Sequence, residues 1–210
     1  MIRNFWKCTP GRSKNSGMRI ALLATILAFS ATAANAQQKS VELMRYSVCQ
    51  YGKDFQVAEV HELESEIDRP NFGEPSKTVH LLDGYSIYVA YKEDEAFANV
   101  KIEQLRDTTY EADSKALIEG LQHMAANSKG LESTTPSKSE SNGFDVYGIN
   151  FTSFDSNILA VYLLLNPKTH TATTIYLLND YPETRKFSTI AQFHTLRDAF
   201  LTGMLSCFKQ

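Results

Sequence analysis

The chain has 210 residues, of which 43% are hydrophobic, and it carries a formal net charge of -3 and three cysteines. These values exclude a disordered chain, a collagen-like repeat and a miniprotein held together by many disulfides. The mildly acidic balance also argues against a broad surface that binds nucleic acids.

Residues 1–36 have the three parts of a secretory signal peptide. Five basic and no acidic residues precede an apolar run over residues 20–29, and the small residues that follow end in Ala34-Asn35-Ala36. An uncleaved membrane anchor is the alternative, but the run is about half of the roughly 20 residues that a membrane-spanning helix needs. Met18 would begin a shorter signal, so Met1 and Met18 are both candidate start residues. The sequence therefore predicts export, into a periplasm or out of the cell.

Removal of the signal would leave residues 37–210 as a single exported domain. This part keeps 16 of the 21 basic residues and all 24 acidic residues, which gives a net charge of -8 over 174 residues. At this size one domain with a sizeable core is expected. The acidic surface disfavours anionic partners, nucleic acids among them. No second apolar stretch approaches membrane-spanning length, so no span is expected in the mature chain.

Two cysteines would remain, Cys49 near the new N-terminus and Cys207 near the end of the chain. In an oxidising compartment such a pair more often forms a disulfide than stays reduced. A redox-active or nucleophilic thiol is the alternative, but a redox pair usually has the C-x-x-C spacing. The sequence therefore predicts a structural disulfide between Cys49 and Cys207.

The first part of the domain reads as strands, because apolar and polar residues alternate with a period of two. These strands are expected over residues 41–51, 56–62, 79–82, 85–91 and 97–105. Residues 65–77 contain Pro70, Gly73 and Pro75 among charged side chains, and are expected to form an exposed loop.

A helix is expected over residues 111–127, with Thr109 as its N-cap and with acidic residues in its first turn. Residues 132–143 are polar and could form a mobile loop or an edge strand. Three further strands and a C-terminal amphipathic helix complete the chain, over residues 144–154, 158–166, 171–179 and 189–208. Strands grouped on both sides of a helix favour an α+β fold, in which an antiparallel sheet is packed by two main helices in a sandwich-like, single domain.

Known motifs of catalysis are missing from the sequence. His61-Glu62 begins an H-E pattern, but Ser65 stands where the second histidine of a zinc protease would be. There is no G-x-S-x-G elbow and no glycine-rich phosphate loop. His194 and Asp198 share a helix face, so they could form part of a site with a third group from elsewhere. No metal or other cofactor is predicted, and the enzyme hypothesis has no specific support.

Aromatic side chains are the most suggestive feature of the predicted strands. Tyr85 and Tyr91 lie on one face of their strand, and Tyr162 lies on another strand of the same sheet. Tyrosine suits half-buried strands, so these rings could be ordinary core residues. The alternative is an exposed aromatic face that binds a partner or an apolar ligand, because binding interfaces are rich in tyrosine.

The order of the predicted elements resembles that of the exported PsbP-like modules. The features that carry this resemblance are the helix 111–127, the hairpins around Asp155 and Pro167, and the closing helix 193–208. The resemblance covers residues 79–208 and implies a small α/β/α sandwich that acts as an accessory or assembly factor. It transfers no binding residue, and a shared fold does not by itself imply chemistry.

Two functions follow as hypotheses. The first is an exported, non-catalytic accessory or binding protein that holds an unknown protein or small ligand on its sheet or in a groove between sheet and helix. The alternative is a hydrolase whose site is assembled around His194 and Asp198, and that would require a concave pocket in which catalytic groups converge.

Overall fold

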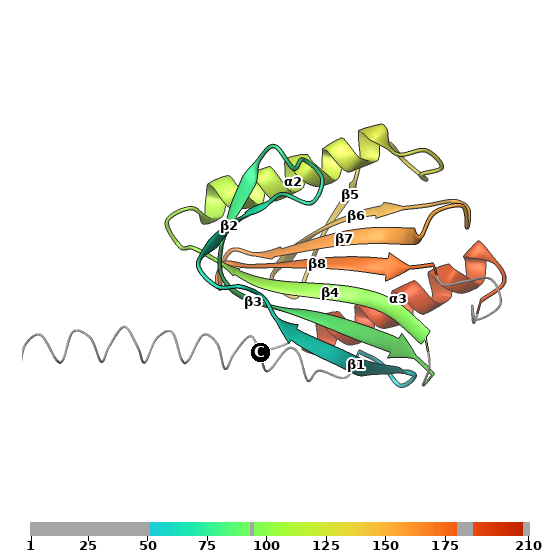
Figure 1. Cartoon of the computed structure of the whole chain (residues 1–210). Helices are drawn as coiled ribbons and strands as arrows, with labels where there is room; N and C mark the ends of the chain where they lie inside the picture. Colours follow the sequence, from blue (N-terminus) through green and yellow to red (C-terminus); the bar gives the residue numbers. More distant parts are fainter. Residues whose placement is uncertain (1–50, 93–94, 180–186, 208–210) are drawn as a thin grey trace, which may run out of the picture. The chain divides into compact units, whose positions relative to one another are not determined.

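The computed structural model describes residues 51–92, 95–179 and 187–207, all within the compact unit Ser40–Gln210. Two helices lie among these residues, α2 (Tyr110–Asn127) and α3 (Ile190–Cys207). The strands are β1 (Phe55–Glu62), β2 (Ile67–Pro70), β3 (Thr78–Tyr91), β4 (Glu95–Leu105), β5 (Ser137–Ser141), β6 (Phe144–Asn150), β7 (Ile158–Asn166) and β8 (Thr171–Leu178) (Figure 1). The α+β class predicted from the sequence is confirmed.

All described strands belong to one antiparallel sheet with the order β1-β3-β4-β8-β7-β6-β5. Strand β2 pairs with the first residues of β3, and β1 pairs with the rest of the same edge. Short turns join β5 to β6 and β7 to β8, and the second of these is the hairpin predicted around Pro167. The β4–β8 pairing joins the strands before α2 to those after it, which makes one continuous sheet.

The two strands expected at residues 79–82 and 85–91 are a single strand, β3, 14 residues long. The predicted division between these two ranges is therefore wrong. The register shifts between Leu81 and Asp83, and the strand continues through Gly84. A Cβ atom on Gly84 would lie 2.8 Å from the carbonyl oxygen of Ile102, so the glycine permits close approach of the neighbouring strand.

The exposed loop predicted over residues 65–77 is also corrected, because part of it is strand β2. Pro70 is tolerated because it ends a strand at the sheet edge. The remainder of the segment packs on α2: the Asn71 side chain is buried and donates a hydrogen bond of 2.6 Å to the carbonyl of Ala116. Gly73 approaches the backbone of Gly120 so closely that a Cβ atom would lie 1.8 Å from its carbonyl oxygen.

The polar segment 132–143 contains β5, which forms the edge of the sheet beyond β6. Of the two alternatives open in the sequence, the edge strand is therefore confirmed. The side chains of β5 are almost all exposed, and such a short, charged strand is typical of an edge that resists pairing with other molecules.

Helix α2 begins where the sequence predicted, with Thr109 at the N-cap position. The Thr109 hydroxyl does not cap the backbone, however. It donates a 2.7 Å hydrogen bond to the carboxylate of Asp113, which is buried in the first turn.

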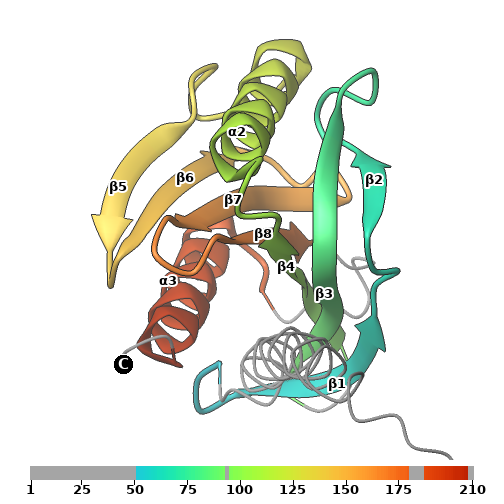
Figure 2. The same ribbon diagram turned by 90° about the vertical axis from the view of Figure 1, so that its left-hand side faces the viewer.

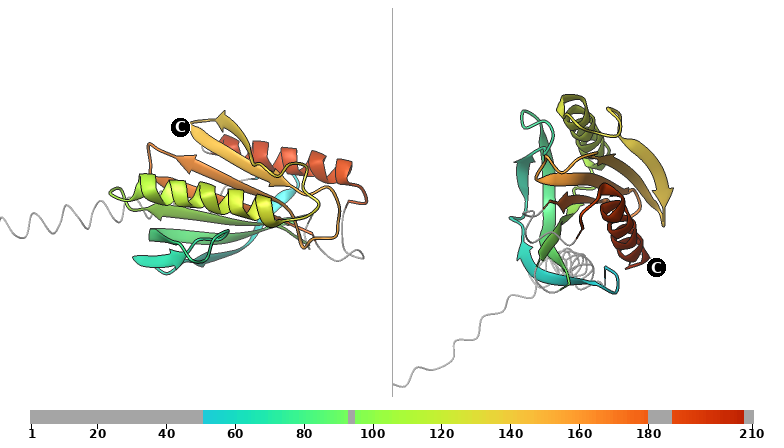
Figure 3. Two further views of the ribbon diagram at one scale, coloured as in Figure 1. Left: turned by 90° about the horizontal axis from the view of Figure 1, so that it is seen from above. Right: turned by 90° about the vertical axis from the view of Figure 1, so that its right-hand side faces the viewer.

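The two helices pack against different sets of sheet side chains. Phe193, Phe200 and Met204 of α3 are buried with alternate residues of β3, β4, β7 and β8, which confirms the predicted apolar stripe. Leu117 and Leu121 of α2 are buried with the other set of alternate residues on β7 and β8, which includes Val161, Leu163 and Ala172. Since neighbouring residues of a strand point to opposite faces, α2 and α3 lie on opposite faces of the sheet. Strands β6, β7 and β8 run between the two helices in Figures 2 and 3.

One buried ion pair interrupts the apolar packing beneath α2. The Arg69 guanidinium of β2 contacts the carboxylate of Glu103 on β4, whose side chain is 0% exposed. Among the described residues, Glu103 Oε1 and Arg69 Nε have no hydrogen-bond partner. Burial raises the pKa of the neighbouring Tyr176 to about 12, with a smaller contribution from the charge of Glu103. The charge of Glu103 is therefore compensated within the fold mainly by Arg69.

Replacement of Gly203 tests how closely the segment before β1 packs on α3. Alanine favours a helix interior by about 1 kcal/mol over glycine, but a Cβ atom here would lie 2.2 Å from the carbonyl oxygen of Tyr51. Gly203→Ala is therefore expected to lower the free energy of unfolding by about 2 kcal/mol, as overpacking does. Thr202→Ala, at the exposed neighbouring position, is the control and should change it by less than about 0.5 kcal/mol. A more stable Gly203→Ala variant would contradict this contact.

Candidate functional site

An open groove of about 430 Å³ runs between α2 and the sheet. Four of the α2 residues that line it are spaced four positions apart and form one row: Tyr110, Ser114, Ile118 and Gln122. A parallel row carries the charged residues Glu111, Lys115 and Glu119. The opposite wall consists of Asp145, Leu165 and Pro167. This α2 groove, defined by these ten residues, has the size of small-molecule sites.

A second cavity of about 390 Å³ adjoins the α2 groove. It lies along the β5–β6 turn, where Glu140 lines it, and it shares Asp145 and Pro167 with the groove. The two cavities therefore form neighbouring parts of one hollow surface beside α2.

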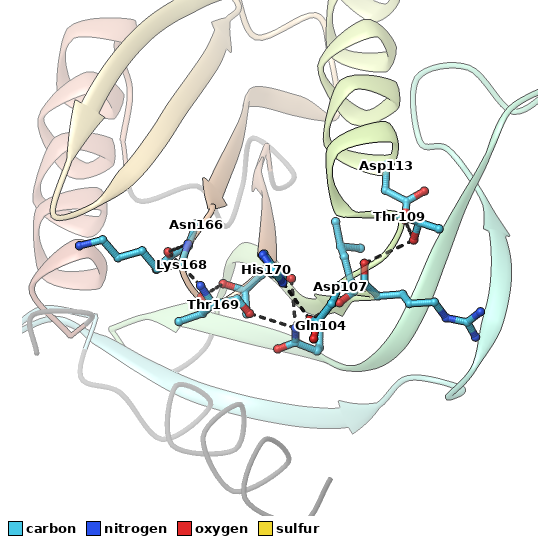
Figure 4. A network of polar contacts seen from close by, with 11 residues as sticks. Gln104, Asp107, Thr109, Asp113, Asn166, Lys168, Thr169 and His170 are labelled. Atoms are coloured by element: carbon cyan, nitrogen blue, oxygen red, sulfur yellow. Dashed lines mark hydrogen bonds and ion pairs between the residues drawn. The ribbon is translucent and has the colours of Figure 1, made fainter. Parts of the chain in front are cut away.

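The turn that carries Pro167 is fixed by side chains on both sides (Figure 4). Within it, the Asn166 carboxamide oxygen accepts a hydrogen bond from the backbone of Lys168. From β4, Gln104 Nε2 donates to the backbone carbonyls of Thr169 and His170, at 3.0 and 3.2 Å. Because the turn is tied to β4, the wall of the groove is formed before any ligand arrives.

The start of α2 is held against the same turn. His170 Nδ1 lies 2.8 Å from an oxygen of Asp107, and its ring lies on that of Tyr110 with 4.7 Å between centroids. Tyr110 is the first residue of α2 and the end of the groove wall. The β4–α2 link and the β7–β8 turn therefore position one end of the groove together.

Ser114 is the buried polar residue of the groove. It is 8% exposed. Burial raises the pKa of Tyr110, and a hydrogen bond with the Ser114 hydroxyl partly opposes this increase. The Ser114 oxygen is itself buried, so it belongs to the packing of the groove wall beside Tyr110.

Acidic side chains predominate along the two cavities. Glu119 is already compensated, because Lys77 Nζ lies 2.8 Å and Lys115 Nζ 3.9 Å from its oxygens. The hydrogen bond and charge of Lys77 hold the pKa of Glu119 below its usual value. Three other acids have no basic group within ion-pair distance in the part of the chain that the structure describes: Glu111, Asp145 and Glu140.

The aromatic face suggested by the sequence is not a surface. Tyr85, Tyr91 and Tyr162 are 3%, 8% and 8% exposed and belong to the core cluster beneath α3. Their strand positions point them toward the helix, where aromatic rings fill the space between helix and sheet. Tyr88 alone among the tyrosines of β3 is exposed, at 38%, on the other face.

His194 and Asp198 engage different partners. His194 Nε2 lies 3.2 Å from Glu132 Oε1, within ion-pair distance but without hydrogen-bond geometry. Asp198 accepts a hydrogen bond of 2.9 Å from Arg197, and Arg197 also donates to Asn150. Glu132 therefore lies beside His194 as a third group, but no contact joins His194 to Asp198 in the described part of the chain.

The described residues test other predicted features only in part. Cys49 and the strand expected over residues 41–51 lie outside the described residues, apart from Tyr51; Cys207 is the last residue of α3. Among the described residues, no three His, Cys, Asp or Glu side chains are grouped to hold a metal ion. No described helix combines the length and the apolar character needed to cross a bilayer.

Sequence reasoning missed the α2 groove, although one signal was present. The four-residue spacing of Tyr110, Ser114, Ile118 and Gln122 places them on one helix face. Their partner wall comes from β6 and the β7–β8 turn, and nothing in the sequence indicates which strand α2 covers.

No protein-family model matches the chain, and comparisons with curated proteins and with solved structures found no match either. The resemblance to PsbP-like modules therefore continues to rest on the order of the elements alone.

Proposed function

We propose that this chain is an exported, non-catalytic accessory or binding protein that takes its ligand in the α2 groove. It would act in a periplasm or outside the cell, as the signal-like residues 1–36 predict. The proposal includes a sandwich-like packing, in which α2 and α3 cover the two faces of the sheet and α2 forms a wall of the site.

The observation that carries this proposal is the preformed hollow beside α2. Its apolar residues Ile118, Leu165 and Pro167 share the lining with polar side chains, among them Glu111 and Asp145. Binding sites of small ligands commonly combine an apolar lining with a few polar groups that orient the ligand. A hydrolase around His194 is less well supported, because Glu132 is the one described acid that contacts it.

A fragment screen followed by two-dimensional NMR tests the proposal. Fragments are expected to shift the amide signals of Tyr110, Ser114 and Leu165 as one group. Gln122→Trp should suppress these shifts, because Gln122 is exposed and lines the groove. Ala126→Trp is the matched control: it adds the same ring one turn further along α2, at an exposed position outside the lining, and should leave the shifts intact.

Two outcomes would contradict the proposed function. Shifts confined to the surroundings of His194 and Glu132, together with turnover of an ester or peptide probe that His194→Ala abolishes, would favour the hydrolase. An absence of shifts at the groove across a library of anionic, neutral and cationic fragments would exclude the groove as the binding site.

A further inference from the structure

We propose that residues 63–77 form a strap that opens as one unit while the rest of the sheet stays folded. The strap joins β1 to β3 and contains β2. It lies on the side of α2 that faces away from β5 and β6 (Figure 2), and none of its residues lines the α2 groove. Its opening is therefore a property separate from ligand binding in that groove.

The strap contributes little to the apolar core. Among residues 63–77, Asn71 alone is buried, and it is polar. The apolar side chains Leu63, Ile67 and Phe72 are only half-buried, and Phe72 meets the ring of Tyr176 edge-on with centroids 6.3 Å apart. Segments that bury few apolar side chains open at a lower free energy than the core of the same protein. The closed strap therefore depends mainly on polar contacts.

Polar contacts tie the strap to α2. They join residues of the strap to residues of the helix: Asn71 to Ala116, Gly73 to His123, and Lys77 to Glu119. Asn71 lies deepest, yet its Oδ1 atom has no hydrogen-bond partner among the described residues. Lys77 and Glu119 are partly exposed, so water can replace their contact at little cost.

The ion pair between Arg69 and Glu103 is the contact that holds the strap closed most firmly. The side chain of Glu103 is 0% exposed and that of Arg69 is 18% exposed, and a buried charge without its partner is costly. The pair is incompletely satisfied, because Glu103 Oε1 and Arg69 Nε have no hydrogen-bond partner in the described part of the chain. When the strap opens, both charges reach water together, and hydration of these atoms offsets part of the loss of the ion pair.

The rest of the sheet keeps its pairing without the strap. Strand β2 pairs with β3 through only four residues, whereas β4 pairs with residues 81–91 of β3 and β1 pairs with residues 85–91. Just before β2, Glu66 has a left-handed backbone with φ of 54°, which is uncommon for a residue other than glycine. Opening would relieve this conformation and free the backbone of residues 78–81 at the sheet edge.

Backbone hydrogen exchange, followed by NMR at increasing low concentrations of urea, tests the proposal. The amides of Asn71 and Lys77 are hydrogen-bonded within the strap. They are expected to exchange roughly a hundredfold faster than the amides of Leu163 and Ile175, in the central strands β7 and β8. Urea should change the exchange of the strap only slightly, because local opening exposes far less surface than global unfolding does.

Two variants compare a buried with an exposed ion pair of the same strap. Glu103→Gln leaves Arg69 without its charged partner and should accelerate exchange in the strap by about tenfold or more. Lys77→Met removes the exposed pair with Glu119 and should change it by less than about threefold. Thermal unfolding of each variant verifies that the fold is kept, and the urea dependence of the wild type tests the strap without any variant.

Three results would overturn the proposal. Strap amides that match those of β7 and β8 in rate and in urea dependence would show that the strap opens only when the whole domain unfolds. Strap amides that exchange at unrelated rates would show that it does not open as one unit. Equal acceleration by Lys77→Met and Glu103→Gln would show that the buried ion pair does not hold it closed.

Discussion

Replacement of both Cys49 and Cys207 by serine is expected to cost about 5 kcal/mol of stability in the chain-entropy model of a disulfide. The cost is large because the two cysteines are 158 positions apart in the sequence, and a bridge between them would restrict almost the whole unfolded mature chain. The measurement is the free energy of unfolding in denaturant, for the wild type and the double variant under non-reducing conditions.

The packing of Tyr51 supports this bridge. Its ring stacks on Phe200 of α3 with centroids 5.4 Å apart, and its carbonyl lies against Gly203. Tyr51 follows Cys49 by two residues, and Cys207 lies one helical turn after Gly203. The chain beside Cys49 is thus held close to the end of α3.

Mass spectrometry of the denatured protein checks the bridge itself. Reduction should increase the mass by two hydrogen atoms in the wild type and leave the double variant unchanged. If the wild-type mass does not respond to reduction, the disulfide prediction is wrong. Loss of residues 1–36 in the same spectrum would support export.

Arg69→Met is expected to lower the free energy of unfolding by about 3–5 kcal/mol, which is the usual cost of removing one partner of a buried ion pair. The side chain of Glu103 is 0% exposed and would remain in the protein interior without the guanidinium that contacts it. Methionine preserves most of the apolar length of arginine, so the loss would come chiefly from the uncompensated carboxylate. Chemical unfolding at neutral pH measures the difference.

The double variant Arg69→Met/Glu103→Leu separates charge from packing. It should recover most of the loss, because a buried ion pair can often be replaced by apolar residues at little cost. Lys77→Met is a control at an exposed ion pair with Glu74 and Glu119, and should cost less than about 1 kcal/mol. A double variant as unstable as Arg69→Met alone would show that the charge of Glu103 is not the cause.

Local patterns in the sequence predicted most elements correctly. The β7 and α2 segments match their expected bounds closely, because period-two and period-3.6 patterns extend over many residues there. Errors arose where the local signal conflicts with a tertiary contact. Gly84 reads as a break, but it continues β3 because β4 approaches it closely. Pro70 reads as a loop residue, but it ends a strand that pairs with β3.

The sequence by itself determined the α+β class, the amphipathic helices and the acidic character of the domain, since these depend on composition and on periodicity along the chain. Only the tertiary structure decided which side chains are exposed and which meet. It placed Tyr85, Tyr91 and Tyr162 in the core beneath α3. It also brought Asp145 and Pro167 to the face of α2 that carries Ser114. The physical reason is that a strand pattern fixes the two faces of a strand, but not which face each helix covers.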